Sequence, residues 1–353
     1  MYKSFLKPIL FRFDPENIHD FFISAGETFG NDAMMRAVIS AMYGYRGADI
    51  SKIVDRINYR TPFMLAAGFD YNGRLSRILP RIGLGGEEIG SVTARPCEGN
   101  PKPRLTRLPR SKSILVNKGL RNDGVDAIIA RLKEAPKEKI DGVSFVRGIS
   151  IARTNDDKSV PIEAGIEDYC YSFKRLNEEG VGDFYTINIS CPNAFGAEAF
   201  NDPVLLPRLL SALKQIPCSK PVYVKMPINA PWERFEALLK AIDAHGLTGV
   251  VIGNLNKEYS MLDIRAEAPD KYSGGLSGKP CVGLSTELIR KTRAAYGRRF
   301  TIIGVGGVQS PAEAVEKFAA GADLVQLITG LIYEGPGLIK EMCDGYAKYK
   351  SIK

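Results

Sequence analysis

The feature that most constrains this chain is a series of eight short apolar runs that alternates with helical or loop-like stretches from about residue 60 onward. Strands that are apolar throughout indicate a parallel sheet covered on both faces, and stretches such as 232–245 and 311–320 have the period of amphipathic helices. Eight strand–helix units in about 290 residues fit an α/β fold of the (β/α)8 TIM barrel type. The expected strands are 63–67, 88–92, 144–151, 184–189, 221–226, 249–253, 301–305 and 323–328, with 113–117 as an added strand outside the barrel.

Residues 1–45 differ from the rest and are expected to form a small N-terminal helical extension, with the barrel in 46–353. Asp14 followed by Pro15 predicts a helix start, and aromatic and aliphatic residues alternate there with lysine and arginine. Basic amphipathic helices with aromatic residues suit a lipid interface. The extension is therefore either a docking cap or an apolar tunnel with peripheral contact at the inner face of the cytoplasmic membrane.

Composition narrows the partners. The chain has 353 residues, with 44% hydrophobic and 25% charged residues, which is the composition of a globular protein. Its net charge of +8 favours anionic small molecules or anionic lipid, and the basic run 102–112 lacks the interleaved aromatic residues of a nucleic-acid site. Six dispersed cysteines and two histidines predict no metal site and no His-dependent triad.

Glycines follow the last two predicted strands of the barrel. Gly306 and Gly307 come after the seventh strand, and Thr329 and Gly330 after the eighth. Glycine lets backbone N–H groups approach phosphate oxygens, and these two loops form the usual phosphate site of such barrels. The pattern predicts phosphate binding, with tight turns of no function as the alternative.

Polar residues also end the fourth and fifth predicted strands. Lys225 ends an apolar run, so its ammonium points into the barrel mouth and needs an anionic or carbonyl partner. It could form a Schiff base or stabilise the anion of a reduced cofactor. Asn188 and Asn193 offer amides that suit an imide or amide ring, and the thiol of Cys191 is either a proton acceptor or a buried structural group.

Seven motifs together resemble the FMN-dependent dihydroorotate dehydrogenases, and among them the membrane-associated, quinone-dependent class 2. They cover nearly the whole chain and read LFRFDPENIHDF, LAAGFDYNG, EIGSVTARPCEGNPKPRLTRLP, INISCPNA, SGGLSGKP, IIGVGG and GLIYEGPGLIKE. The resemblance implies oxidation of (S)-dihydroorotate to orotate in pyrimidine biosynthesis, with electrons passed through FMN to a quinone that enters at the N-terminal helices.

The resemblance also implies roles for individual residues. The FMN phosphate would be held by Gly278, Gly307, Thr329 and Gly330, with Gly306 in the same loop. The flavin ring would be lined by Ala67, Gly68, Ser91 and Asn188, with Lys225 facing its pyrimidine edge. The orotate ring would be held by Asn117, Asn188, Asn193 and Asn254. Cys191 would remove the C5 proton while C6 delivers hydride to flavin N5.

Several positions depart from the class 2 pattern. Cys191 is the base of the soluble class 1 enzymes, where class 2 usually has serine, and Tyr71 replaces a lysine. Ser150 and Leu255 replace an asparagine and a threonine, and Asn117 is displaced by one position within its loop. Two alternatives therefore stay open: a flavin barrel of the same superfamily acting on another dihydropyrimidine-like substrate, and a barrel that binds FMN or a sugar phosphate without catalysis.

Overall fold

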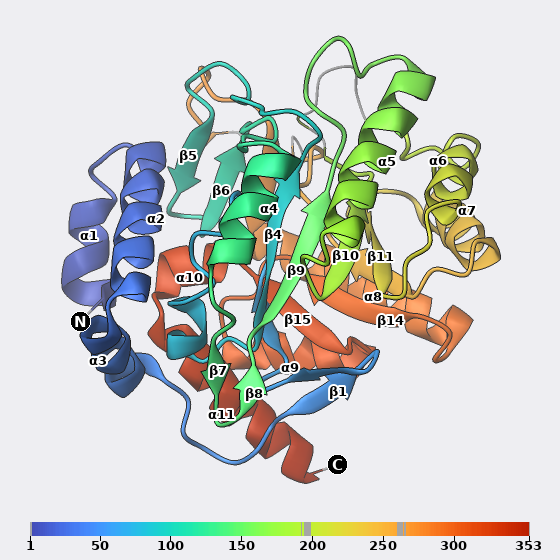
Figure 1. The fold of residues 1–353 in the computed structure, drawn as a ribbon. Helices are drawn as coiled ribbons and strands as arrows, with labels where there is room; N and C mark the ends of the chain where they lie inside the picture. The colour runs from blue at the N-terminus through green and yellow to red at the C-terminus, as the bar shows by residue number, and fades with distance from the viewer. Residues whose placement is uncertain (1, 192, 194–198, 260–263, 265, 353) are drawn as a thin grey trace.

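The computed structural model describes residues 2–191, 193, 199–259, 264 and 266–352. Its centre is a closed barrel of parallel strands, surrounded by helices (Figure 1). In chain order the barrel strands are β3 (Phe63–Leu65), β4 (Gly86–Val92), β9 (Val146–Ile151), β10 (Phe184–Asn188), β11 (Val222–Met226), β12 (Gly249–Ile252), β14 (Thr301–Val305) and β15 (Leu324–Leu327). β15 pairs with β3 and closes the barrel. The prediction of a (β/α)8 barrel is confirmed, and each strand overlaps a predicted run, although β4 begins two residues before the predicted 88–92.

Most barrel strands are followed by a helix, and the two helices predicted at 232–245 and 311–320 are confirmed. The helices that follow the strands are α4 (Val125–Glu134), α5 (Ile162–Glu178), α6 (Leu206–Lys214), α7 (Trp232–Ala244), α8 (Val282–Tyr296), α9 (Pro311–Ala320), α10 (Thr329–Glu334) and α11 (Gly337–Ile352). The first unit differs, because only a 3₁₀ turn, Leu79–Ile82, lies between β3 and β4. The C-terminal helix α11 packs against this turn and against α3 (Ala33–Tyr43), so helices from both chain ends cover that side of the barrel.

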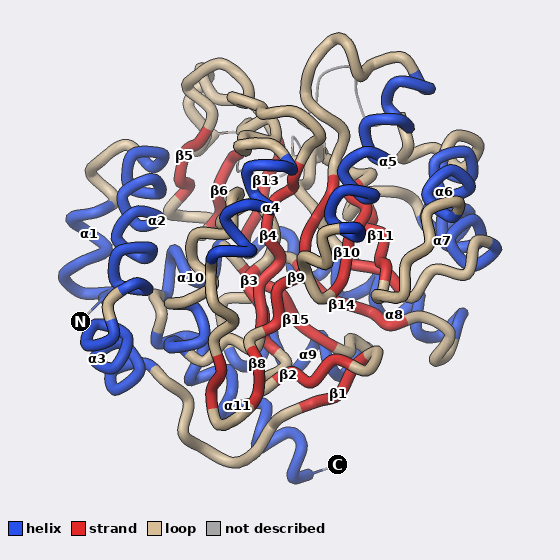
Figure 2. The backbone as a smooth tube through the Cα atoms, in the orientation of Figure 1, coloured by secondary structure: helices blue, strands red, loops and turns tan. Residues whose placement is uncertain are grey.

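A second sheet lies outside the barrel near the carboxyl ends of its strands (Figure 2). It is antiparallel and has the order β13 (Gly275–Gly278), β6 (Ser113–Val116) and β5 (Leu105–Leu108). The predicted extra strand at 113–117 is therefore confirmed as β6. The hydroxyl of Tyr333 donates to the carbonyl of Ser113 at 2.7 Å and ties this sheet to α10.

The opposite end of the barrel is closed by a hairpin of β1 (Lys52–Val54) and β2 (Ile57–Tyr59). Asp55 in its turn accepts hydrogen bonds from Tyr223 at 2.6 Å and Thr301 at 3.1 Å, at the beginnings of β11 and β14. A further two-stranded hairpin is formed by β7 (Lys139–Ile140) and β8 (Val143–Ser144). The barrel therefore opens to ligands at the carboxyl ends of its strands.

The N-terminal extension consists of a π-helical turn at Tyr2–Leu6, α1 (Lys7–Leu10), α2 (Pro15–Asn31) and α3. These helices lie together on one side of the barrel (Figure 1). The predicted start of α2 is confirmed: Asp14 accepts the backbone N–H groups of Glu16 and Asn17, as expected of an N-cap. No helix in the described part of the chain is long and apolar enough to span a bilayer. The boundary at 45/46 stays a prediction.

Candidate active site

A single cavity of about 810 Å³ joins the barrel mouth to the N-terminal helices. Its walls contain residues from the carboxyl ends of strands all around the barrel, which is where the active sites of this fold lie. The predicted site residues that line it are Ala67, Gly68, Ser91, Asn188, Cys191, Asn193, Lys225, Asn254, Gly278, Gly306, Gly307, Thr329 and Gly330. The structure therefore brings together, on one surface, residues that are more than 200 positions apart in the sequence.

Asn117 is the exception. The cavity is lined by its neighbours Val116 and Lys118, and Asn117 lies outside the described lining. Its side-chain oxygen accepts a hydrogen bond from Nδ2 of Asn100 at 2.8 Å. Because the end of β6 turns Val116 toward the cavity, Asn117 faces the adjoining loop. A contact between Asn117 and substrate stays a prediction.

Lys225 occupies the centre of the mouth. It is paired in register with Asn188 of the neighbouring strand, and both side chains point to the barrel axis. Lys225 is only 5% exposed, and within the described residues its ammonium makes no ion pair. A buried cation without a counter-charge is costly. The mouth is therefore suited to a ligand with an anionic or electron-rich edge.

A network of amides and hydroxyls surrounds Lys225. Asn254 donates from Nδ2 to Oγ of Ser190 at 2.8 Å and to Oδ1 of Asn188 at 3.2 Å. Asn188 in turn donates to Oγ of Ser91 at 2.8 Å, and Ser91 shares a 2.8 Å hydrogen bond with Ser150. Ser150, one of the departures from the family pattern, thus completes the network. The network fixes which edge each amide presents to a bound ring.

Cys191 and Asn193 follow the end of β10. Cys191 is half-buried and lines the cavity, whereas Pro192 lies outside the described residues. Asn193 is held by a hydrogen bond from its Nδ2 to the carbonyl of Val116 at 2.8 Å, which links the barrel to the outer sheet. The thiol and the amide are therefore presented at the same rim of the mouth.

The glycine-rich loops form a narrow backbone cradle. A Cβ on Gly307 would lie 2.5 Å from the carbonyl of Gly278, and one on Gly330 would lie 2.2 Å from the carbonyl of Val308. Gly278 and Gly307 also have φ values of +104° and +76°, which favour glycine. The hydroxyls of Ser277 and Thr329 are 2.9 Å apart in this cradle. The sequence analysis missed Ser277, although it lies within the SGGLSGKP motif.

The other end of the cavity is apolar. Its walls come mainly from the N-terminal helices and include Phe5, Leu6, Ile9, Phe11, Ile18, Phe21, Phe22, Phe29, Ile39 and Tyr43. Several apolar side chains of these helices also face solvent, among them Phe5, which is 71% exposed, and Met34, which is 73% exposed. We call this end of the cavity, between the N-terminal helices, the vestibule. The vestibule is therefore lined by apolar side chains, and its helices also present apolar side chains to solvent.

Arg107 is the cation of the vestibule. Its guanidinium lies 4.7 Å from the ring centre of Phe11 and donates to the carbonyls of Phe13 at 3.0 Å and Leu10 at 3.3 Å. Burial lowers the pKa of Arg107, with the nearby hydroxyls of Tyr333 and Tyr2 acting in the opposite direction. The sequence analysis had placed this residue only in a basic run, because nothing local in the sequence reveals that β5 faces α1.

A buried charge cluster attaches the vestibule to the barrel. Glu16 of α2 accepts from Nε of Arg104 at 2.9 Å and lies 3.2 Å from Nζ of Lys118. Burial acts to raise the pKa of Glu16, but the hydrogen bond from Arg104 and the charge of Lys118 outweigh it, so the pKa is lowered. Nε2 of His19 donates to the carbonyl of Phe69, beside Gly68, at 2.8 Å. Helix α2 is thus connected directly to the first loop of the mouth.

Tyr71 packs next to this cluster. Its ring centre lies 5.4 Å from Nζ of Lys118 and 5.2 Å from the His19 ring. Because Lys118 is paired with Glu16, it is not a spare cation that could stand in for the lysine the family has at position 71.

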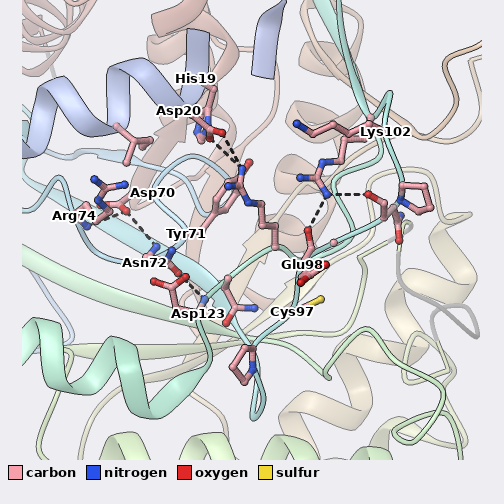
Figure 3. A pocket seen from close by; sticks show the side chains of 18 residues that line it. His19, Asp20, Asp70, Tyr71, Asn72, Arg74, Cys97, Glu98, Lys102 and Asp123 are labelled. Carbon is pink, nitrogen blue, oxygen red and sulfur yellow. Dashed lines mark hydrogen bonds and ion pairs between the residues drawn. The ribbon is translucent and has the colours of Figure 1, made fainter. Parts of the chain in front are cut away.

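A second, polar pocket of about 690 Å³ lies on the outer side of the cluster (Figure 3). Its charged groups are largely paired with other protein groups: Arg121 with Asp20 at 3.1 Å, and Arg74 with Glu27. Among the described residues, no group of three or more His, Cys, Asp or Glu side chains is arranged to hold a metal ion. The chemistry is therefore concentrated in the cavity of the mouth.

Comparisons with known proteins agree with this geometry. The family model for dihydroorotate dehydrogenase matches residues 50–349. The chain is 34% identical over 346 residues to a dihydroorotate dehydrogenase (quinone) of Christiangramia forsetii, covering 97% of both chains. It is 33% identical to the enzyme of the same name from Thermosynechococcus vestitus, covering 98% of this chain and 95% of that one. In fold it is similar to a crystal structure of DHODH from Eimeria tenella in complex with ferulenol, with a TM-score of 0.81, 23% identity and coverage of 96% and 92%.

Proposed function

The chain belongs to the dihydroorotate dehydrogenase family, and we infer that it oxidises dihydroorotate to orotate in pyrimidine biosynthesis with a quinone as the electron acceptor. The similarity to quinone-type enzymes extends over nearly the whole chain, including the N-terminal helices. The observation that carries the inference is the single cavity with a polar end at the barrel mouth and an apolar end at the vestibule. A polar substrate and an apolar acceptor need these two environments.

We propose that the barrel mouth binds FMN. The cradle of Gly278, Gly307 and Gly330 leaves no room for a Cβ, so backbone N–H groups can approach a phosphate. At the other end, the unpaired ammonium of Lys225 suits the electron-rich edge of a flavin ring. Gly68 has φ of +111°, which favours glycine, and it lines the cavity without a side chain that would hinder a flat ring. When bound, FMN supplies the two-electron redox chemistry that no side chain here can supply.

The remaining residues of the mouth have roles toward the substrate. Asn188, Asn193 and Asn254 offer paired donors and acceptors that can hold the amide edges of the dihydroorotate ring. Cys191 would be the base that takes the proton from C5 of dihydroorotate, and FMN, when bound, would supply the acceptor for the electron pair of the C6–H bond. The amino group of Lys225 lies in the mouth, where it can interact with negative charge that accumulates on a bound ring.

The vestibule is proposed as the quinone entrance. Its interior is apolar, and its exterior exposes large apolar residues such as Phe5, Phe21 and Met34 together with lysine side chains. Such a surface suits the interface of a membrane, where a quinone is dissolved. We therefore propose peripheral membrane contact through α1 to α3.

The first test is anaerobic mixing of the purified protein with L-dihydroorotate while the visible flavin band is followed. We expect prompt bleaching, and recovery of the band when a short-chain quinone is added. A yellow protein that is bleached by dithionite but not by dihydroorotate would contradict the substrate. A colourless protein would contradict the cofactor.

A second candidate substrate is favoured by one observation. The site contains Tyr71 and the Ser91–Ser150 hydrogen bond where the class 2 pattern has a lysine and an asparagine. The alternative is therefore a flavin enzyme for another dihydropyrimidine-like ring. Dihydrouracil and dihydrothymine in the same anaerobic assay distinguish the two, because only the correct ring will bleach the flavin.

A further inference from the structure

Three lysines are buried among the described residues, and their partners differ. Lys118 is paired with Glu16, and Lys225 faces the cavity described above. Lys317 is 0% exposed and has no ion pair with any described carboxylate. Burying an ammonium without a carboxylate costs free energy. The barrel fold alone does not explain why a lysine is buried at this position.

The contacts of Lys317 are two hydroxyls. It lies on α9, and its Nζ donates to Oγ of Ser285 and to Oγ1 of Thr286, the latter at 3.2 Å. Its aliphatic chain crosses β14 at Gly304, where a Cβ would lie 3.4 Å from Cδ of Lys317 and 2.8 Å from Cδ1 of Ile289. The first glycine of the GVGG motif therefore lies under this lysine and packs closely against Ile289.

Lys317 lies in the last turn of α9, where a cation is favourable, but its ammonium meets the N-terminal turns of a second helix. Ser285 and Thr286 lie in the first turns of α8, a helix of 15 residues whose N-terminus carries partial positive charge. Burial lowers the pKa of Lys317 to about 8, against the opposing influence of Glu316, Cys281 and Glu313. The ammonium of Lys317 and the N-terminus of α8 both carry positive charge, so both would stabilise an anion bound near them.

The loop between Lys317 and the cavity is the glycine cradle. Oγ of Ser285 lies 3.5 Å from the carbonyl of Gly306, and a Cβ on Gly306 would lie 2.9 Å from that hydroxyl. The N-terminus of α8 is equally close, since a Cβ on Gly307 would lie 2.9 Å from the backbone nitrogen of Val282. Lys317, Ser285 and the start of α8 therefore stand directly behind Gly306 and Gly307.

We propose that Lys317 is a positioning residue for the phosphate end of the cofactor. Its ammonium holds the Ser285 hydroxyl against the Gly306–Gly307 loop and supplies, from behind, positive charge that a phosphate in the cradle neutralises. This inference rests on the proposed function. With Lys225 it gives the cofactor two buried cations, one behind the phosphate and one at the ring edge.

The test compares two ligands that share a flavin ring and differ in the phosphate. Apoprotein is titrated with FMN and with riboflavin, and binding is followed by quenching of flavin fluorescence. For Lys317→Met we expect the Kd for FMN to rise about tenfold or more while the Kd for riboflavin changes less than about twofold. Lys291→Met, which removes an exposed lysine from α8, is the matched control and leaves both values unchanged.

Ser285→Ala keeps the lysine and removes the hydroxyl that connects it to the loop. We expect the same selective loss of FMN affinity in this variant, which also serves if Lys317→Met folds poorly. Between pH 7 and 9 the FMN affinity of the unsubstituted protein should fall as Lys317 loses its proton, and this fall should be absent in Lys317→Met. The same pH series with riboflavin, which lacks the phosphate, detects any pH effect that acts through the flavin ring instead.

The outcomes separate this inference from the proposed function. An equal loss of FMN and riboflavin affinity in both variants would mean a structural role and would overturn the inference. Unchanged FMN binding in both variants would also overturn the inference, but it would not contradict the proposed function. An unsubstituted apoprotein that binds neither ligand would overturn the proposed function together with the inference.

Discussion

The two ends of the cavity are built on different principles. At the barrel mouth, each functional side chain stands at the end of a strand and is fixed by neighbours, as in the chain of hydrogen bonds from Asn254 through Asn188 to Ser91. At the vestibule, the walls are apolar side chains of helices, whose polar contacts with the rest of the chain include those of Glu16 and Arg107. The mouth can therefore orient a polar ring, whereas the vestibule selects by shape and hydrophobicity.

The sharpest test of the mouth is removal of the proposed base. Cys191→Ala should lower the turnover of dihydroorotate by about 10²–10⁴-fold, the usual contribution of a positioned proton acceptor. Cys191→Ser should retain part of the activity with a shifted pH–rate profile, because a hydroxyl and a thiol ionise over different pH ranges. Steady-state kinetics across pH measures both. Bound flavin per chain should stay the same, and an unchanged rate in Cys191→Ala would exclude the thiol as the base.

The contact between the N-terminal helices and the barrel is tested by substituting Glu16, the carboxylate at the centre of the buried charge cluster. Glu16→Gln leaves Arg104 and Lys118 buried without their counter-charge, which should lower the free energy of unfolding by about 3–5 kcal/mol. Urea denaturation measures the loss. The control is Asp20→Asn at the exposed edge of the same cluster, for which we expect about 1 kcal/mol or less. Equal effects of the two substitutions would contradict the distinction between a buried and an exposed pair.

The same carboxylate gives the molecule a predicted pH dependence. The pKa of Glu16 is lowered in the folded state. The stabilisation from Glu16 is therefore present above the unfolded-state pKa of about 4.3 and is lost as the pH falls through the lower, folded-state pKa. Glu16→Gln should remove this part of the acid destabilisation.

The smallest effect is expected from narrowing the vestibule. Ala25→Trp fills part of its wall, so the KM for a short-chain quinone should rise about tenfold while anaerobic reduction by dihydroorotate is unchanged. Ser24→Trp places the same ring on the solvent side of α2 and serves as the control. If Ala25→Trp slowed the anaerobic reduction instead, the two ends of the cavity would not be separate in function.

The difference between the two ends also explains what could be read from the sequence. The strand ends were predictable because apolar runs define the strands and alternation then places Lys225 and Asn188 in the mouth. The bounds of the outer sheet and the role of Arg107 were not, because β13 pairs with β6 across more than 150 residues and the short strands have weak patterns. Asn117 lies outside the lining of the cavity because a shift of one residue at the end of β6 reverses the direction of a side chain. Ser277 and Lys317 have meaning only through contacts between distant segments.

The outer sheet links cofactor binding to the stability of the folded protein. Through Gly278 this sheet contributes to the phosphate cradle, which otherwise belongs to the loops after β14 and β15. A cofactor held as proposed therefore fastens the sheet to the barrel and, at a free concentration a hundredfold above its Kd, adds about 2.7 kcal/mol to the stability of the folded state. A chain that has bound the cofactor would then unfold less readily than a chain without it, and the outer sheet would separate from the barrel less often.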